Sequence, residues 1–200
     1  MTRKLLLGTR NHGKVAELRA LLKGLDVELE SVDDLADPPS DPPEDAPSYA
    51  ENAVFKARAY ARATRLTTIA DDSGLEVDAL GGAPGVRSRR FFGEEATPAE
   101  RNRMLLGLLD GVTDRTARFV AVIALADPDG RVETFDGEVR GEIAESPRGE
   151  DGFGYDPVFI IAEDGRTMAE VPREEKNAIS HRGLAGAKLR AALATRQPLT

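Results

Sequence analysis

A pair of long strand patterns separated by a tight turn restricts the fold more than any other feature of the sequence. The segments Arg118–Leu125 and Val132–Val139 are rich in residues that favour strands, and Asp127–Gly130 between them reads DPDG. This composition is typical of the turn in a β-hairpin. At least two strands are therefore expected to run antiparallel. Because strand and helix patterns are mixed elsewhere in the chain, we predict an α/β class with a mixed sheet.

Apolar periodicity and capping signals predict the other elements. Four further strands are expected at Lys4–Gly8, Val27–Val32, Thr67–Ala70 and Val158–Ile161. Four helices are expected from about Val15 to Gly24, from Ser48 to about Thr64, from Thr97 to near Gly111, and from Ser180 onward through Leu184, Leu189 and Leu193. The third of these strands is expected to end at the polar residues Asp71–Gly74.

Negative charge is concentrated in one part of the chain, whose formal net charge is −8. No lysine or arginine occurs between Gly24 and Phe55, whereas ten acidic residues lie from Asp26 to Glu51. Without those ten charges the remainder carries +2 (−8 plus 10), so it can accept an anionic ligand. The net charge argues against broad binding of nucleic acid, which needs a basic face. Within the acidic part, Asp33–Pro47 holds five prolines and is predicted to be irregular; we call it the acidic loop.

Length and composition fit a single globular domain over residues 1–200, with 40% hydrophobic and 31% charged residues. The sequence contains neither an apolar run of about 18 residues, as a membrane span requires, nor a signal-peptide pattern. Cysteine is absent, which excludes disulfides, thiolate chemistry and cysteine-based zinc sites. We expect a cytoplasmic protein with no membrane partner.

Two polar stretches that follow predicted strands carry candidate binding residues. Thr9–Lys14, which reads TRNHGK, leads into a helix, where backbone N–H groups favour anions and Lys14 adds a positive charge. An ordinary strand–helix turn would have a similar composition, and the Walker A spacing is absent. Asp71 and Asp72 could hold Mg²⁺, which commonly binds one or two carboxylates and takes its other ligands from water and phosphate. The alternative for the aspartates is a turn with solvated acids.

Three further stretches carry candidates for phosphate and base binding. Gly81–Arg90 combines a Gly/Pro turn with three arginines, which suits a phosphate clamp or a basic surface cluster. Gly152–Pro157 places glycines beside two aromatic residues, which suits a flat ligand or a turn anchored in the core. Lys176 and Ser180–Arg182 supply donors near the start of the last helix. The chain has two histidines, too few for a three-histidine zinc site.

Six short motifs, in this order along the chain, resemble the inosine/xanthosine triphosphate pyrophosphatase family, whose members remove deaminated purine nucleotides. The match extends from Leu7 to about Leu189. The motifs are T-x-N-x-x-K from Thr9, E-N-A-x-x-K-A from Glu51, D-D-S-G-L from Asp71, G-G-A-P-G from Gly81, G-F-G-Y-D-P from Gly152 and S-H-R from Ser180. The resemblance implies an elongated mixed sheet flanked by helices, two lobes with a cleft between them, and a homodimer. It also implies Mg²⁺-dependent hydrolysis of ITP, dITP and XTP to the monophosphate and pyrophosphate.

The resemblance further implies a role for each matching residue. Asp72 is implied as the general base and as a metal ligand. Glu44 of the acidic loop is implied as the second metal ligand, with Asp45 as the alternative, because two glutamates often stand together here in the family. Arg10 stands where glycine is common, which could alter the phosphate contacts. The substrate-binding residues implied are Thr9, Arg10, Asn11, His12, Gly13, Lys14 and Ser73 for the phosphate side, and Phe153, Gly154, Tyr155, Asp156, Lys176, His181 and Arg182 for the base side.

The predicted reaction is an in-line attack on the α-phosphorus by a water that the general base or the metal activates, with pyrophosphate leaving. Lys14, together with Arg90 and Lys56, would offset the phosphate charge. Donors from His181 and Arg182 would favour a 6-oxo purine, because a buried donor facing the amino group of adenine stays unpaired at a cost of about 1–3 kcal/mol. Two other functions stay open: a pyrophosphatase for other modified nucleotides, and a nucleotide-binding module without turnover.

Overall fold

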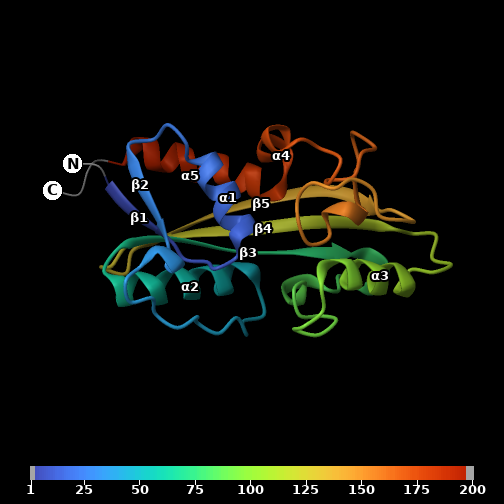
Figure 1. Ribbon diagram of the computed structural model, residues 1–200, viewed down its shortest axis with the longest axis horizontal. Coiled ribbons are helices and arrows are strands. Elements are labelled where there is room, and N and C mark those ends of the chain that lie inside the picture. The colour runs from blue at the N-terminus through green and yellow to red at the C-terminus, as the bar shows by residue number, and fades with distance from the viewer. Residues whose placement is uncertain (1–2, 197–200) are drawn as a thin grey trace. The chain divides into compact units, whose positions relative to one another are not determined.

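The computed structural model describes residues 3–196, which form one six-stranded sheet and five α-helices (Figure 1). The strands are β1 (Arg3–Leu7), β2 (Val27–Ser31), β3 (Thr67–Val77), β4 (Thr116–Ala126), β5 (Val132–Ile143) and β6 (Phe159–Ile161). The helices are α1 (His12–Leu21), α2 (Tyr49–Thr64), α3 (Pro98–Leu108), α4 (Arg173–Ile179) and α5 (His181–Thr195). The strand order is β2-β1-β3-β4-β5-β6, with β1 parallel to both β2 and β3 and with β5 antiparallel to β6. The predicted mixed α/β class is confirmed.

The predicted hairpin is β4 and β5, and both strands extend beyond the predicted ranges. The two strands are neighbours in the sheet. The backbone N–H of Asp127 donates to the carbonyl of Arg131 at 2.9 Å, and that of Gly130 donates to the carbonyl of Asp127 at 3.0 Å. Gly130 has φ +98°, a conformation that favours glycine. The turn residues therefore have the role that their composition predicts.

The chain divides into two compact units. Unit 1 comprises residues 3–72, 121–137 and 182–196. It contains β1, β2, α1, α2, the first part of β3, the ends of the hairpin strands nearest their turn, and α5 from its second residue onward. Unit 2 comprises Ser73–Val120 and Glu138–His181. Each unit has its own hydrophobic core.

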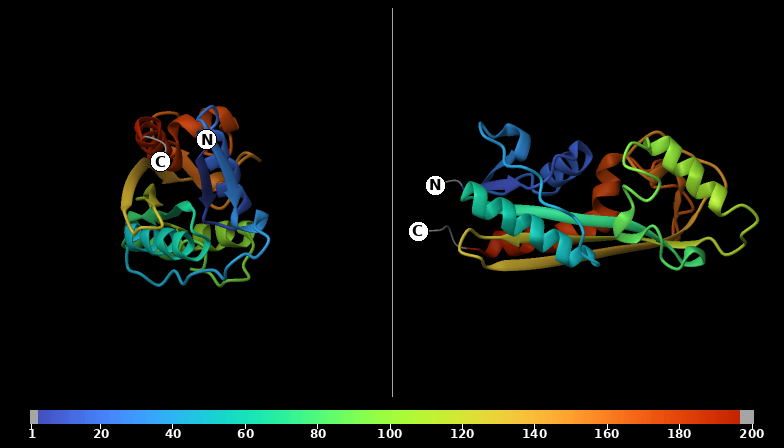
Figure 2. Two further views of the ribbon diagram at one scale, coloured as in Figure 1. Left: turned by 90° about the vertical axis from the view of Figure 1, so that its left-hand side faces the viewer. Right: turned by 90° about the horizontal axis from the view of Figure 1, so that it is seen from below.

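The core of unit 1 lies on both faces of β1. Leu5 and Leu7 are fully buried in one cluster, which includes Leu189 of α5, while Leu6 is buried in a second cluster with Tyr60 of α2. Alternate residues of a strand point to opposite faces, so three consecutive leucines predict a strand that is covered on both sides. Figures 1 and 2 show α2 on one face of the sheet at β1, and α1 and α5 on the other face.

The core of unit 2 is built around aromatic and branched side chains, which include residues of β4 and of the edge strand β6. Phe119 of β4 and Phe159 of β6 pack with their ring centroids 4.5 Å apart. Leu105 and Leu109, at the C-terminal part of α3, are fully buried in the same cluster. The loop that precedes β6 is held against this core, and it carries the glycine-rich motif.

The third strand does not end at Asp71–Gly74 as predicted, because β3 continues through this stretch to Val77. Asp71 and Asp72 are both buried, with exposed fractions of 0% and 5%. The predicted strand end is therefore wrong, and so is the alternative of a turn with solvated carboxylates. Buried partners from other elements satisfy them, so the polar residues do not end the strand.

The helix starts agree with their capping signals, and one helix was not predicted. The Ser48 hydroxyl accepts from the backbone N–H of Glu51 at 3.2 Å, and Thr97 forms a capping box with Glu100. The short helix α4, which precedes Ser180, has no capping side chain to indicate it. Within residues 3–196, none of the helices has the length and apolar character needed to cross a membrane.

Candidate active site

The loop between β1 and α1 is built closely against its surroundings. A Cβ atom on Gly8 would lie 2.9 Å from side-chain atoms of Thr68 and Tyr60, so this position accepts no side chain without a shift. The Thr9 hydroxyl accepts from the backbone N–H of Asn11 at 3.2 Å, and the Asn11 side chain caps α1 by accepting from the N–H of residue 14 at 3.2 Å. The predicted strand–helix junction is therefore rigid, and it directs the first turn of α1 toward β3.

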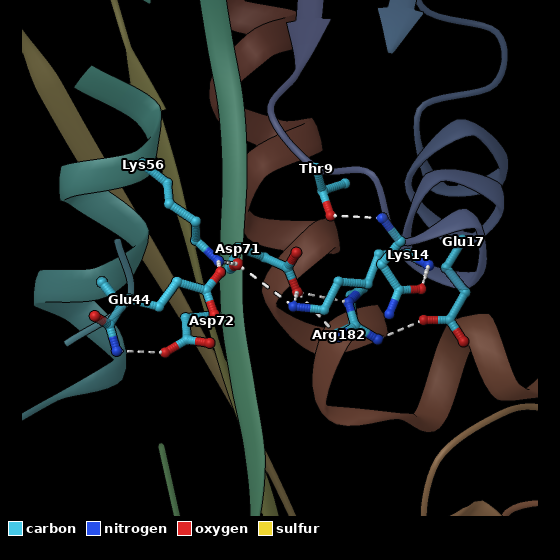
Figure 3. Close-up of polar contacts among 10 residues, drawn as sticks. Thr9, Lys14, Glu17, Glu44, Lys56, Asp71, Asp72 and Arg182 are labelled. Carbon is cyan, nitrogen blue, oxygen red and sulfur yellow. Dashed lines mark hydrogen bonds and ion pairs between the residues drawn. The ribbon is translucent and has the colours of Figure 1, made fainter. Parts of the chain in front are cut away.

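Two lysines from different helices meet at Asp71. The ammonium group of Lys14, on α1, lies 3.2 Å from Asp71 Oδ2. The ammonium group of Lys56, on α2, donates to the backbone carbonyl of Asp71 at 2.6 Å and to Glu44 at 2.6 Å. Burial lowers the pKa of Lys14, and the charge of Asp71 opposes this shift. The cluster therefore concentrates cationic groups at the centre of β3, as Figure 3 shows.

Asp71 and Arg182 form a buried ion-pair network with Glu17. The Arg182 side chain is 2% exposed, donates to Asp71 Oδ2 through Nε at 3.0 Å, and donates to Glu17 Oε2 through Nη1 at 2.6 Å. Burial acts to raise the pKa of Asp71, but Lys14 and Arg182 outweigh it and hold this pKa well below its ordinary value. Asp71 is thus ionised and serves as an internal counterion.

The resemblance implies a contact between Arg182 and the base. In the structure its guanidinium lies between two carboxylates of unit 1. The sequence contained no signal for Glu17 as its partner, because the two residues are 165 positions apart. Helix packing alone brings them together.

Asp72 points away from Asp71, toward α2. Its Oδ2 atom accepts from the side-chain amide of Asn52 at 2.9 Å. Burial raises the pKa of Asp72, and the charges of Lys56 and Lys14 oppose that shift. Successive residues of a strand face opposite sides, which is why the two adjacent carboxylates do not share one site. Of these two carboxylates, Asp72 is the one that faces the acidic loop.

Glu44 is the residue of the acidic loop that reaches this cluster. Its carboxylate lies 2.6 Å from the ammonium group of Lys56, and its charge contributes to raising the pKa of Asp72. Asp45 is exposed, so the geometry favours Glu44 between the two candidates. Among residues 3–196, no group of three or more acidic or histidine side chains is placed so that it could hold a metal ion.

The Asp72 and Glu44 pair fits Mg²⁺ nonetheless. This ion commonly binds one or two protein carboxylates and completes its shell with water and substrate phosphate. Asp72 is a buried carboxylate whose ionised form burial disfavours, and Glu44 adds a like charge to its surroundings. A divalent cation beside them would offset both effects.

Three residues of the Thr9–Lys14 stretch place no side chain in the lysine cluster, which is formed by Lys14 and Lys56 at Asp71. Arg10 binds the acidic loop through Asp33 and Asp41. The His12 side chain is 91% exposed and lies 3.8 Å from Asp33. Gly13 lies in the first turn of α1 and has no side chain to offer.

Unit 2 contains a second polar cluster, around Asp156. Its Oδ2 atom accepts from the backbone N–H of Phe153 at 2.7 Å and from the ammonium group of Lys176 at 2.7 Å. The same ammonium group lies 4.9 Å from the centroid of the Phe153 ring. A Cβ atom on Gly152 would lie 2.2 Å from Asp156 Oδ2, and its φ of +79° also favours glycine. The motif residues are therefore brought together as predicted, with Asp156 as the hub that shapes the loop.

Tyr155 and His181 are both buried in unit 2. Tyr155 is 5% exposed and belongs to the core, and its hydroxyl donates to the carbonyl of Ser88 at 2.9 Å, so it anchors the loop. Burial raises the pKa of Tyr155 to about 12. The His181 ring is 5% exposed and stacks on Phe119, with centroids 4.7 Å apart. Gly154 has φ +66°, and its carbonyl accepts from the side chain of Asn102 at 3.1 Å.

Polar residues on the inner face of α2 are the main addition from the structure. Asn52 and Lys56 are 1% and 5% exposed, and they stand one helical turn apart beside the buried Ala53 and Ala57. The spacing of four places both on one helix face. Polar residues within the small-residue stripe of a helix are thus the signal that could have placed Asn52 as well as Lys56.

The fold and the first cluster define a class: a mixed α/β protein in which buried lysines and carboxylates gather beside a helix start, an arrangement suited to an anionic ligand. The chain belongs to the Ham1 family, whose family model matches residues 5–192. This finding confirms the resemblance that the six motifs indicate.

Similar proteins cover nearly the whole chain. A relative from Geobacter sulfurreducens named dITP/XTP pyrophosphatase is 50% identical over 192 residues, which are 95% of this chain and 96% of the relative. A dITP/XTP pyrophosphatase from Deinococcus deserti is 50% identical over 190 residues, which are 95% and 89% of the two chains. The solved structure of a HAM1 protein from Coxiella burnetii superposes with a TM-score of 0.88 at 40% identity, covering 97% of this chain and 100% of that one.

Proposed function

We propose that the chain hydrolyses deaminated purine nucleoside triphosphates, namely ITP, dITP and XTP, to the monophosphate and pyrophosphate. Relatives of about half identity and nearly full length bear the name dITP/XTP pyrophosphatase. The observation that carries the proposal is the buried convergence of Lys14 and Lys56 on Asp71, with the carboxylate of Asp72 alongside. It combines cations for phosphate with a carboxylate for chemistry.

The triphosphate is assigned to the lysine cluster of unit 1. Phosphoryl transfer depends mainly on positioning and on neutralising charge, and Lys14 and Lys56 supply two positive charges whose places are set by Asp71. The first turn of α1 adds the partial positive charge of a helix N-terminus, and Thr9 and Asn11 shape the loop that precedes it. Arg182 supports this cluster indirectly, because its ion pair with Asp71 holds that carboxylate in place.

Asp72 is assigned as the general base and, with Glu44, as the ligand pair for Mg²⁺. When bound, the ion would neutralise phosphate charge and polarise the phosphoryl group. Asp72 would accept the proton of the attacking water at its carboxylate. The Asn52 amide fixes the orientation of that carboxylate, and Lys56 favours its ionised form.

The base is assigned to the second cluster, in unit 2. Phe153 offers a ring face, and the ammonium group of Lys176 above it is held in place by Asp156. Lys176 and His181 are the donors assigned to the 6-oxo group of the base. A buried donor left facing an amino group loses its hydrogen bond, at a cost of about 1–3 kcal/mol, which would disfavour adenine.

We also propose that the chain forms a homodimer in the cytoplasm. We propose no nucleic-acid or membrane partner for it. The dimer and the location are supported by the family resemblance, and the acidic net charge of −8 supports the absence of nucleic-acid binding. Sedimentation velocity of the purified chain tests the dimer directly. A monomeric boundary at micromolar concentration would contradict it.

The test of function is a pyrophosphate-release assay on ITP, XTP, GTP, ATP and dTTP at equal concentration, with Mg²⁺ and with EDTA. We expect kcat/KM for ITP and XTP to exceed that for ATP by about tenfold or more, with IMP or XMP as product and no turnover in EDTA. Orthophosphate in place of pyrophosphate would mean cleavage at the γ-phosphate and would overturn the mechanism. No turnover of any of these nucleotides would favour modified nucleotides as substrates, and tight binding without turnover would favour a binding module.

A further inference from the structure

We propose that Arg10 is a positioning residue that ties the acidic loop to the loop between β1 and α1, and thereby holds Glu44 at Lys56. The inference rests on the proposed function, because Glu44 is assigned there as a ligand for Mg²⁺. It differs from the role that the sequence predicts for Arg10, which is contact with the substrate.

Three acceptors spread along the acidic loop bind the same guanidinium. Arg10 Nε donates to Asp41 Oδ1 at 2.7 Å, and Nη2 donates to the backbone carbonyl of Pro39 at 2.9 Å. Nη1 donates to Asp33 at the beginning of the loop. A guanidinium carries five N–H donors in a fixed fork, so one arginine can hold three separated acceptors, whereas the ammonium of a lysine is a point donor.

The acidic loop depends on side chains of other elements for its attachment, which include Arg10 and, at Ala46, the Asn52 side chain of α2. Its five prolines cannot donate backbone hydrogen bonds, and beyond a short 3₁₀ turn at Val32–Asp34 it has no regular structure. The chain here runs along the side of α2 that faces away from the sheet (Figures 1 and 2). Asp41 is the point of attachment, because it also accepts from the hydroxyl of Tyr60 on α2 at 2.8 Å.

Fixing Asp41 also fixes the direction of Glu44. The two residues between them are Pro42 and Pro43, whose rings lock φ and make this segment stiff. Glu44 then contacts Lys56 at 2.6 Å. The contacts on either side of the proline pair thus belong to one stiff segment, so that weakening the attachment of Asp41 also weakens that of Glu44.

The place of Arg10 in the chain makes this tether a coupling between two functional loops. Arg10 lies between Thr9 and Asn11, whose side chains shape the loop before α1. Its side chain leaves that loop and is directed to the acidic loop, with three of its donors engaged. The residues assigned to phosphate and the residue assigned to the metal are therefore held in register by one side chain.

The first experiment measures loop mobility without metal or nucleotide. The chain has no cysteine, so Ser40→Cys, at an exposed position of the acidic loop, provides a single thiol for a nitroxide spin label. We expect Arg10→Ala in this background to speed the motion of the label by about threefold or more, as the loss of a charged contact network on the surface allows. Asp41→Asn, which weakens the same attachment from the other side, is expected to act in the same direction.

The matched control is Arg19→Ala. Arg19 pairs with Asp34 at 2.8 Å, so the variant removes the same charge and a contact to the beginning of the same loop, but leaves the attachment at Asp41 intact. It is expected to leave the label at residue 40 unchanged. Equal mobility of the label with and without Arg10 would overturn the proposal, whatever the protein hydrolyses.

The second experiment separates positioning from substrate contact. For Arg10→Ala acting on ITP, we expect the Mg²⁺ concentration at half-maximal rate to rise by about three- to tenfold, with a smaller change in KM for ITP at saturating Mg²⁺. For Arg10→Lys, the Mg²⁺ concentration at half-maximal rate should lie between the values for the wild type and Arg10→Ala. A raised KM with an unchanged Mg²⁺ requirement would mean that Arg10 contacts the phosphates and would overturn the proposal. If the wild type does not hydrolyse ITP at all, the proposed function fails while the mobility result still decides the tether.

Discussion

Two neighbouring carboxylates on β3 have opposite electrostatic environments. Asp71 is fully buried against Lys14 and Arg182, which hold its pKa below the ordinary value, whereas burial raises the pKa of Asp72. The difference follows from the alternation of side chains along a strand, which turns one carboxylate toward α1 and α5 and the other toward α2. One residue is thereby suited to hold cations in place, and the other to accept a proton.

Asp72→Asn is predicted to lower kcat by at least about a hundredfold, because general-base catalysis of this kind contributes about 10²–10⁴. The fold should remain, since the asparagine oxygen can still accept from Asn52 and the variant removes a charge that burial disfavours. Pyrophosphate release and thermal unfolding measure the two effects. Asp37→Asn, at an exposed position of the acidic loop outside the proposed site, is the control and should turn over normally. A fully active Asp72→Asn would sink the assignment.

Glu17→Gln is predicted to lower the free energy of unfolding by about 1–3 kcal/mol, because it weakens the charge balance of a buried arginine. Glu17 and Arg182 are both buried in this pair. Urea denaturation at neutral pH measures the change. Asp136→Asn, which removes one partner of the exposed pair with Lys188, is the control and should have no measurable effect. Equal stability of the two variants would contradict a structural role for the Glu17–Arg182 pair.

At the scale of elements, the polar motif of β3 and the loop before β6 differ in what shapes them. β3 keeps its course because partners on α1, α2 and α5 satisfy its aspartates. The loop turns sharply because glycines adopt positive φ and a carboxylate caps its backbone, as the contact from the N–H of Phe153 to Asp156 shows. Loop shape is therefore set locally, and the shape of the strand is set by other elements.

Gly152→Ala is predicted to destabilise unit 2 more than Gly154→Ala, which is its matched control. Both glycines have positive φ, but a Cβ on Gly152 would meet Asp156 Oδ2 at 2.2 Å, whereas a Cβ on Gly154 would meet nothing within 4 Å. The control variant should cost about 1–2 kcal/mol from backbone strain alone, and Gly152→Ala should cost more and raise KM for ITP. Urea denaturation and steady-state kinetics test this. Equal effects would show that the contact with Asp156 is unimportant.

At the scale of the whole molecule, residues that are distant in sequence come together around Asp127, at the hairpin turn of unit 1. The Asp127 carboxylate accepts from Thr67 at the beginning of β3 at 2.9 Å and from Arg131 at 2.8 Å, and it pairs with Arg196 after α5 at 3.3 Å. Burial acts to raise the pKa of Asp127, but these hydrogen bonds and charges outweigh it, so its pKa lies below the ordinary value. The folded state therefore favours the ionised carboxylate.

The stability that Asp127 contributes is predicted to be present at neutral pH and lost in acid. A folded pKa below the unfolded one stabilises the protein above about pH 4, and this contribution vanishes as pH falls through the folded pKa. Asp127→Asn should thus be less stable than the wild type at pH 7, and the gap should narrow below about pH 4. Urea denaturation across this range measures it, with Asp37→Asn, at an exposed position, as the control. A gap that does not depend on pH would contradict the linkage.

Local signals in the sequence were enough to predict the hairpin, the helix starts at Ser48 and Thr97, and the mixed sheet. These features depend on interactions between residues close in sequence, namely turn conformation, capping hydrogen bonds and side-chain periodicity. The six motifs likewise indicate the family, because their order along the chain is a property of the sequence.

The direction of each polar side chain depends on contacts that are distant in sequence. The sequence pattern predicts a strand end at Asp71, yet partners on α1, α2 and α5 make Asp71 and Asp72 part of a buried strand. Glu17 holds the Arg182 guanidinium inside unit 1, and Asp41 directs Arg10 to the acidic loop; neighbouring residues in the sequence indicate neither direction. A charged side chain takes the direction in which buried or clustered partners compensate its loss of water, and those partners come from elements that only packing brings together.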